Sequence, residues 1–171
     1  MALLFCHGLE SGPVGAKSVA LRGAGFEVIA PDCRGQGLGA RVRVIAAAIA
    51  EAEVPPLIVG SSFGGIAGLL ASRIAADRGV VVPGLVLLAP ALHLPSALFP
   101  RELSARPLTP PAPTVLVHGR ADAVIPIDIS RRFAAEHGVV LHEVEDDHRL
   151  GASLELIVSV VRQASISTPA C

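Results

Sequence analysis

Short apolar runs alternate with longer stretches of helical pattern along almost the whole chain. The runs are rich in Leu, Val and Ile and are too short for buried helices, which is typical of strands in a parallel sheet covered on both faces. They predict six strands, at residues 3–6, 26–30, 57–60, 85–88, 114–117 and 139–144.

The stretches between these runs predict five helices, at residues 15–24, 41–53, 63–77, 128–136 and 150–161. Gly23 and Gly25 close the first helix, Pro55 and Pro56 follow the second, and Asp128 stands at or near the N-cap of the fourth. Strands that alternate with helices predict an α/β fold of about six parallel strands. Right-handed crossovers place helices on both faces of such a sheet. We expect one domain over residues 1–164 and a loose tail over 165–171.

One segment, residues 90–113, interrupts this alternation because it is rich in Pro and shows no regular period. It is too short for a second domain and therefore forms either a small flap or a long connection. Its apolar side chains have two interpretations: a wall that binds substrate, or a cover for the end of the sheet. These side chains are Leu92, Leu94, Leu98 and Phe99.

Composition narrows the possible functions. Hydrophobic residues make up 51% of the chain, but Pro, Gly or charge interrupts every apolar run before it reaches the length of a membrane span. The net charge of −1 and the absence of Trp and Tyr argue against a nucleic-acid interface. Cys6, Cys33 and Cys171 are odd in number and lack metal-ligand spacing, which indicates reduced thiols in a cytoplasmic protein without a metal site. The start of the chain lacks the charged region of a signal peptide.

The sequence Gly60-x-Ser62-x-Gly64 lies where the third predicted strand meets the third predicted helix. A serine on such a tight turn points its oxygen away from the backbone, and its neighbours must be small. The free N–H groups of the following helix favour developing negative charge at the same place. The pattern therefore predicts a nucleophilic serine, Ser62. The alternative is an ordinary strand–helix turn with an exposed serine.

A serine nucleophile needs a base, usually a histidine that is oriented by a carboxylate. Asp122 follows the fifth predicted strand and His148 follows the sixth, so both loops reach the edge of the sheet where Ser62 lies. The order Ser62, Asp122, His148 is that of one known serine–histidine–acid arrangement. Three separate loops that bring a serine, an acid and a histidine to the same edge of the sheet are a stronger indication of a catalytic site than any single motif.

Other polar residues have simpler explanations. Asp146 and Asp147 are too close to His148 in sequence to orient its ring, and His118 ends a strand, where we expect a structural hydrogen bond. Asp32 and Arg34 are expected to pair or to brace their loop. The remaining histidines are interpreted as surface or edge residues: His93, His137 and His142.

Acyl transfer also needs two donors for the oxyanion. Phe63, directly after the proposed nucleophile, offers one backbone N–H. The loop after the first predicted strand is placed to supply the other, from Leu9. We expect His7 in the same loop to brace it rather than to act as a base.

Together these motifs resemble the α/β-hydrolase superfamily over nearly the whole chain. The matching residues are His7-Gly8-Leu9, Asp32-x-Arg34-Gly35-x-Gly37, Gly60-x-Ser62-x-Gly64-Gly65, His118-Gly119-x-x-Asp122-x-x-Ile125-Pro126 and Asp147-His148. The opening residues 7–13, followed by Lys17, are similar to small bacterial esterases and acyl-protein thioesterases. The resemblance implies a minimal fold without a cap domain or the first two strands of larger members. It also assigns the nucleophile to Ser62, the acid to Asp122 and the base to His148.

The predicted activity is therefore cofactor-free hydrolysis of carboxylic esters that carry small or flexible acyl groups, through an acyl-enzyme at Ser62. Thioesters or other acyl compounds are alternative substrates for the same three residues. A non-catalytic module that binds a small ligand is an alternative of another class, because a fold alone does not establish an activity.

Overall fold

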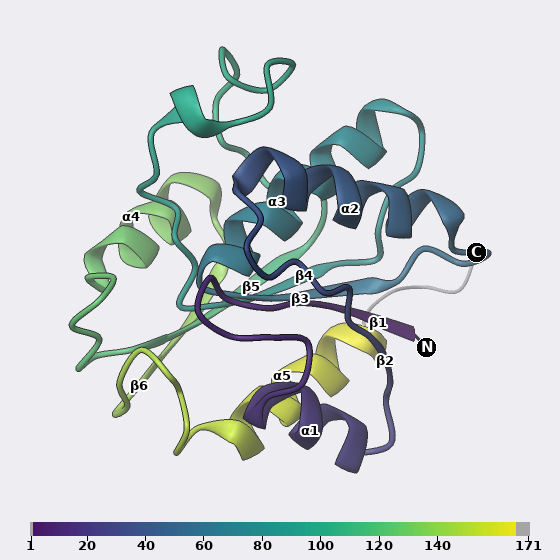
Figure 1. Ribbon diagram of the computed structural model, residues 1–171. Coiled ribbons are helices and arrows are strands. Elements are labelled where there is room, and N and C mark those ends of the chain that lie inside the picture. Colours follow the sequence, from purple (N-terminus) through teal and green to yellow (C-terminus); the bar gives the residue numbers. More distant parts are fainter. Residues whose placement is uncertain (1, 167–171) are drawn as a thin grey trace.

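All six predicted strands form, and they join into one parallel sheet in the order β2-β1-β3-β4-β5-β6 (Figure 1). The computed structural model describes residues 2–166. The strands are β1 (Ala2–Cys6), β2 (Glu27–Ile29), β3 (Leu57–Ser61), β4 (Leu85–Leu88), β5 (Thr114–Gly119) and β6 (Val140–Val144). The strand order reverses between β1 and β3, which is the place where open α/β sheets bind ligands.

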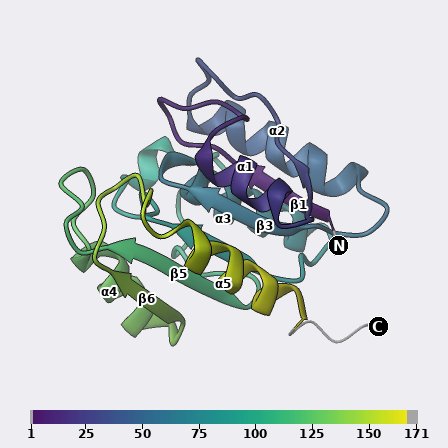
Figure 2. The ribbon, with the colours of Figure 1, turned by 90° about the horizontal axis from the view of Figure 1, so that it is seen from below.

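Five helices cover the two faces of this sheet. They are α1 (Ala16–Gly23), α2 (Leu38–Glu51), α3 (Phe63–Asp77), α4 (Asp128–His137) and α5 (Leu154–Ile166). Helices α1 and α5 lie together on one face, and α2, α3 and α4 lie on the other (Figures 1 and 2). This arrangement confirms the predicted α/β class with helices on both faces.

The core divides in the same way, because successive side chains of a strand point to opposite faces. In β4, Leu85 and Leu87 pack among the residues of α2 and α3. Val86 and Leu88 pack on the other face, with residues of α1 and α5. Both faces of the middle strands are therefore buried, which explains their continuous hydrophobic runs.

Several helix boundaries differ from the predictions. Helix α2 begins at Leu38, because Gly37 is extended and Leu38 already packs in the core. Helix α5 begins only at Leu154, because Leu150 turns the chain with a φ of 54°. It continues to Ile166, so the first two residues of the predicted tail are helical. Residues 167–171 lie outside the described residues.

Asp128 lies next to the N-cap of α4, which agrees with its predicted position at or near the cap, but it does not occupy the cap itself. The N-cap is Ile127, and Asp128 is the first helical residue, without a side-chain cap bond. Its carboxylate instead accepts a hydrogen bond from Arg131 at 2.9 Å. Asp128 therefore supports the first turn through charge, which is favourable near a helix N-terminus.

The segment 90–113 contains a single turn of 3₁₀-helix, Ser96–Leu98, and projects beyond the helices in Figure 1. Leu92, Leu94 and Phe99 pack against the core on the α3 face, whereas 52% of Leu98 is exposed. Among residues 2–166, no helix combines the length and the apolar character needed to cross a membrane.

Candidate active site

The turn between β3 and α3 holds Ser62 in an unusual backbone conformation. Its φ is 54° and its ψ is −118°, a combination that L-residues rarely adopt and that costs free energy unless the surroundings enforce it. The Ser62 N–H donates to the carbonyl of Leu88 at 2.8 Å. The Ser62 carbonyl accepts from the N–H groups of Gly65 at 2.9 Å and Ala91 at 3.1 Å. These three hydrogen bonds fix the backbone conformation of the turn.

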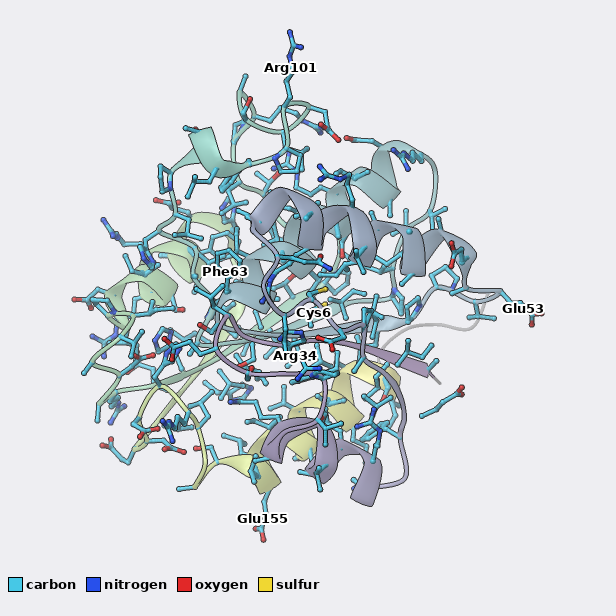
Figure 3. The ribbon with its side chains drawn as sticks, viewed as in Figure 1. Cys6, Arg34, Glu53, Phe63, Arg101 and Glu155 are labelled. Carbon is cyan, nitrogen blue, oxygen red and sulfur yellow. The ribbon has the colours of Figure 1, made fainter. Side chains whose placement is uncertain are left out.

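The glycines of the turn are required by close packing. A Cβ on Gly60 would lie 2.7 Å from the Cα of Gly65. A Cβ on Gly64 would overlap the carbonyl oxygen of Cys6, at the end of β1. Figure 3 labels Phe63 and Cys6 at this junction of α3 and β1. The small residues of the motif therefore let α3 start directly against the neighbouring strand.

Ser62, His148 and Asp122 form a continuous chain of hydrogen bonds. The Oγ atom of Ser62 lies 3.0 Å from Nε2 of His148, and Nδ1 of His148 lies 2.7 Å from Oδ2 of Asp122. The Asp122 side chain is fully buried and the His148 side chain is 20% exposed. The three residues come from the loops after β3, β5 and β6. In this geometry Nε2 can accept the serine proton while Nδ1–H donates to the carboxylate.

The carboxylate of Asp122 is held by more donors than His148 alone. Its Oδ1 accepts from the N–H groups of Val124 and Ile125, both at 2.8 Å. Burial is the largest influence on the Asp122 pKa and raises it, but the hydrogen bonds from Ile125, His148 and Val124 together lower the pKa below its usual value. Asp122 is therefore ionised at neutral pH and cannot rotate freely.

His118 is a second histidine on the same carboxylate. Its Nε2 lies 3.0 Å from Oδ2 of Asp122 and 2.9 Å from the carbonyl of Ile125, and its Nδ1 lies 2.7 Å from Oγ of Ser130. A carbonyl only accepts, so Nε2 carries the proton and Nδ1 accepts from the Ser130 hydroxyl. The predicted structural hydrogen bond of His118 is confirmed, but nothing in the sequence indicated that Asp122 would be its partner.

The loop after β1 is braced by His7. Its Nε2 accepts from the N–H of Cys33 at 2.9 Å, and its Nδ1 donates to the carbonyl of Gly8 at 2.8 Å. Both ring nitrogens are occupied, so His7 supports the loop as predicted. Asp32 and Arg34 also pair as expected, and the hydrogen bonds from the Arg34 side chain and backbone lower the pKa of Asp32 to about 2.

A cavity of about 800 Å³ opens above Ser62 and His148. Its apolar lining includes Leu9, Val124 and Ile125, and its volume is in the range of small-molecule sites. The N–H groups of Leu9 and Phe63, the proposed oxyanion donors, have no acceptor within residues 2–166. A Cβ on Gly8 would lie 3.7 Å from Cβ of Ser62, so the loop after β1 lies directly against the serine.

The predicted apolar wall does not line this cavity. Leu92, Leu94, Leu98 and Phe99 are absent from its lining, although His93 of the same segment is part of it. Leu92, Leu94 and Phe99 pack against the core on the α3 face instead. Leu92 instead lines a separate pocket of about 280 Å³ beside Phe133 of α4.

Several residues that line the cavity were not predicted as site residues, among them His93, Lys17 and Val124. His93 was interpreted as a surface residue, and no local pattern indicates that it faces the cavity. Lys17 is the one lysine of the chain and donates to the carbonyl of Arg149 at 2.6 Å. Among residues 2–166, no cluster of three or more His, Cys, Asp or Glu side chains is suited to a metal ion.

Comparison with known proteins identifies the family. The family model described as alpha/beta hydrolase family matches residues 3–142, which is most of the chain. The chain belongs to the alpha/beta hydrolase family. The match includes Ser62 and Asp122 and ends before His148. Membership of this hydrolase family supports hydrolytic activity, and a search of curated proteins finds no match.

Solved structures share the fold at low sequence identity. Est1E from Butyrivibrio proteoclasticus is 19% identical with a TM-score of 0.80, over 98% of this chain and 87% of that one. The mouse alpha/beta hydrolase domain-containing protein 10 is 22% identical with a TM-score of 0.76, over 98% and 90%. A monoacylglycerol lipase from Paleococcus ferrophilus is 21% identical with a TM-score of 0.64, over 92% and 93%.

Proposed function

We propose that this protein is a serine hydrolase that cleaves carboxylic esters of small or flexible acyl groups. The observation that carries the proposal is the hydrogen-bond chain from Ser62 through His148 to Asp122. Its serine end lies in a cavity that is also lined by Leu9 and Phe63, whose backbone N–H groups have no acceptor among residues 2–166. A nucleophile, a base, a buried acid and oxyanion donors are the parts that acyl transfer requires.

The reaction follows from these positions. The Oγ atom of Ser62 attacks the acyl carbon while its proton moves to Nε2 of His148. The carbonyl oxygen becomes an oxyanion, which accepts hydrogen bonds from Leu9 and Phe63. When this intermediate collapses, His148 gives the proton to the departing alkoxide, and an alcohol and an acyl-serine result. Water then attacks the acyl-serine and loses a proton to His148. When the acyl–oxygen bond breaks, His148 returns this proton to Oγ of Ser62 and the acid is released.

The cavity offers apolar surface to an acyl chain. Exposed apolar side chains stand at its edge, with 54% of Leu9 and 67% of Val124 accessible. Burial of such surface by an acyl chain is favourable, at about 25 cal/mol per Å². The name of one structural neighbour, a monoacylglycerol lipase, agrees with an ester substrate.

The test is hydrolysis of p-nitrophenyl esters from acetate to decanoate by the wild type and by Ser62→Ala. We expect kcat to fall by about 10⁴- to 10⁶-fold, because the nucleophile is lost. Ser72→Ala is the matched control, since Ser72 is a buried serine of the same helix that donates to the Gly68 carbonyl at 2.8 Å. Wild-type turnover in Ser62→Ala would overturn the proposal.

Two further measurements separate the alternatives. Matched thioesters assayed beside the oxygen esters determine which class the same three residues prefer. A fluorophosphonate probe should label the wild type and leave Ser62→Ala unlabelled. Failure to label the wild type would favour the non-catalytic binding module.

A further inference from the structure

A buried arginine of α2, Arg41, lies behind the loop that follows β1. Only 1% of it is exposed, and no carboxylate of residues 2–166 forms an ion pair with it. Its guanidinium donates instead to backbone carbonyls. Nη1 lies 2.9 Å from the oxygen of His7 and 3.3 Å from that of Gly8. Nη2 lies 3.5 Å from the oxygen of Leu9, and Nε lies 3.1 Å from that of Gln36.

Burial of this charge is costly and has to be offset by its hydrogen bonds. Burial lowers the pKa of Arg41, and the side chain nevertheless stays protonated because an arginine pKa starts above about 12. A planar guanidinium has donors in a fixed fork, so it fixes the positions of the carbonyls that accept from it. Arg41 therefore determines where three consecutive carbonyls of the loop point.

The direction of these carbonyls sets the direction of the Leu9 N–H. The C=O of Gly8 and the N–H of Leu9 belong to one trans peptide unit, in which they point opposite ways. The Gly8 carbonyl faces Arg41 and also accepts from His7. The Leu9 N–H consequently points away from α2, and Leu9 lines the cavity above Ser62.

Arg41 also contacts the residue that carries the second proposed donor. Its guanidinium carbon lies 5.2 Å from the centroid of the Phe63 ring, which is within the range of a cation–π interaction. The Phe63 ring projects from the first residue of α3, directly after Ser62. One side chain thus holds both backbone segments that border the acyl carbonyl in the proposed reaction.

We propose that Arg41 is the positioning residue of the oxyanion site. Its guanidinium holds the Gly8–Leu9 peptide and the Phe63 ring so that the N–H groups of Leu9 and Phe63 converge on one oxygen. The inference rests on the serine hydrolase function proposed above. Arg41 itself does not touch the substrate, and it acts through the backbone that it holds.

The test compares Arg41→Met with Arg73→Met. Arg73 is the matched control, because it is a buried arginine of α3 that also donates to a backbone carbonyl, that of Pro107, outside the cavity. Both variants lose a buried charge and should shift Tm. Only Arg41→Met should lower kcat, by about 10²-fold with a similar KM, since small misplacement of catalytic groups has effects of that size.

A transition-state analogue provides a readout that a purely structural role would not change. A trifluoromethyl ketone of matched acyl length forms an oxyanion at Ser62, so its affinity should fall in Arg41→Met in parallel with kcat/KM. Arg41→Lys keeps the charge without the planar fork and should lie between wild type and Arg41→Met. Equal kcat and equal ketone affinity in Arg41→Met and Arg73→Met would overturn the role of Arg41.

The two proposals fail in different ways. Turnover that survives Ser62→Ala refutes the hydrolase mechanism, whereas Ser62-dependent turnover that Arg41→Met leaves intact refutes only the positioning role. If the Arg41 variants do not fold, a crystal structure of the wild-type protein labelled with a fluorophosphonate tests the positioning role instead. A phosphonyl oxygen about 3 Å from the nitrogens of Leu9 and Phe63 supports the proposal. A Leu9 N–H that points elsewhere overturns it.

Discussion

The turn at residues 60–65 and the segment 90–113 leave neighbouring strands at the same edge of the sheet, yet they are built differently. In the turn, backbone groups approach so closely that a Cβ does not fit at Gly60 or Gly64. The segment 90–113 is joined to the protein by apolar packing, a few turns and polar contacts to the arginine and aspartate side chains of α3, and Leu98 is half exposed. The first holds the central residue of the proposed site, whereas the second contributes His93 to the lining of its cavity but none of its apolar side chains.

The comparison shows that precise placement of a polar group comes from backbone contact rather than from apolar content. The two regions do meet, since the carbonyl of Leu88 and the N–H of Ala91 both bond to Ser62. Beyond His93 the segment turns away toward α3, where Arg106 pairs with Asp77 at 2.5 Å. Only the first residues after β4 therefore brace the turn.

The largest expected effect is that of Gly64→Ala. The added methyl group would lie 2.5 Å from the carbonyl oxygen of His7 as well as overlapping that of Cys6, so β1 and α3 must move apart. We expect the free energy of unfolding to fall by about 3 kcal/mol or more, measured by urea denaturation. Gly23→Ala is the control, because nothing lies within 4 Å of its Cβ position and its stability should hold or rise slightly. A Gly64→Ala protein as stable as the wild type would show that the turn is not closely packed.

The next largest effect is expected for Asp122→Asn. An amide oxygen can still accept from Val124 and Ile125, but the NH₂ group then faces the N–H donors of His118 and His148. His148 would have to move its proton to Nε2, where it can no longer accept from Ser62. We expect kcat to fall by about 10⁴-fold with little change in KM. Asp77→Asn, which breaks only an exposed ion pair, should keep wild-type kcat.

The same variant has a second readout in acid. The Asp122 pKa is lowered in the folded protein, so its contribution to stability is present above its unfolded pKa of about 3.9 and is lost as pH falls through the folded value. The free energy of unfolding of Asp122→Asn should therefore decline less steeply below about pH 4 than that of the wild type. An identical decline in both proteins would contradict the lowered pKa.

The smallest effects are expected for two exposed aliphatic residues, one that lines the cavity and one that lies outside it. Val124→Ala removes apolar surface from the cavity, so KM for the longer p-nitrophenyl esters should rise while stability is nearly unchanged. Leu98 lies outside the cavity, so Leu98→Ala should leave the dependence of KM on ester chain length unchanged. The free energy of unfolding should fall by less than about 0.5 kcal/mol. A changed profile in Leu98→Ala would show that segment 90–113 closes over the site, as the original substrate-wall interpretation requires.

Much of the fold followed from the sequence because its determinants are local. Apolar runs of strand length, and glycines that stop a strand and open a helix, indicated the sheet and the turn at Ser62. Two helix starts were misplaced, at Leu38 and Leu154, because the backbone angles of Gly37 and Leu150 decide them. The spacing of apolar and polar side chains along the sequence does not indicate such backbone angles.

The sequence by itself determined the parallel sheet and the three loops that carry Ser62, Asp122 and His148, since the carboxyl ends of parallel strands share one edge. Tertiary structure alone decided which other residues reach that edge. Arg41 meets His7 across 34 positions of sequence, and the apolar residues of segment 90–113 turn away from the cavity. Such contacts depend on the rotation of each helix and the path of each loop, which are set by packing of the whole chain.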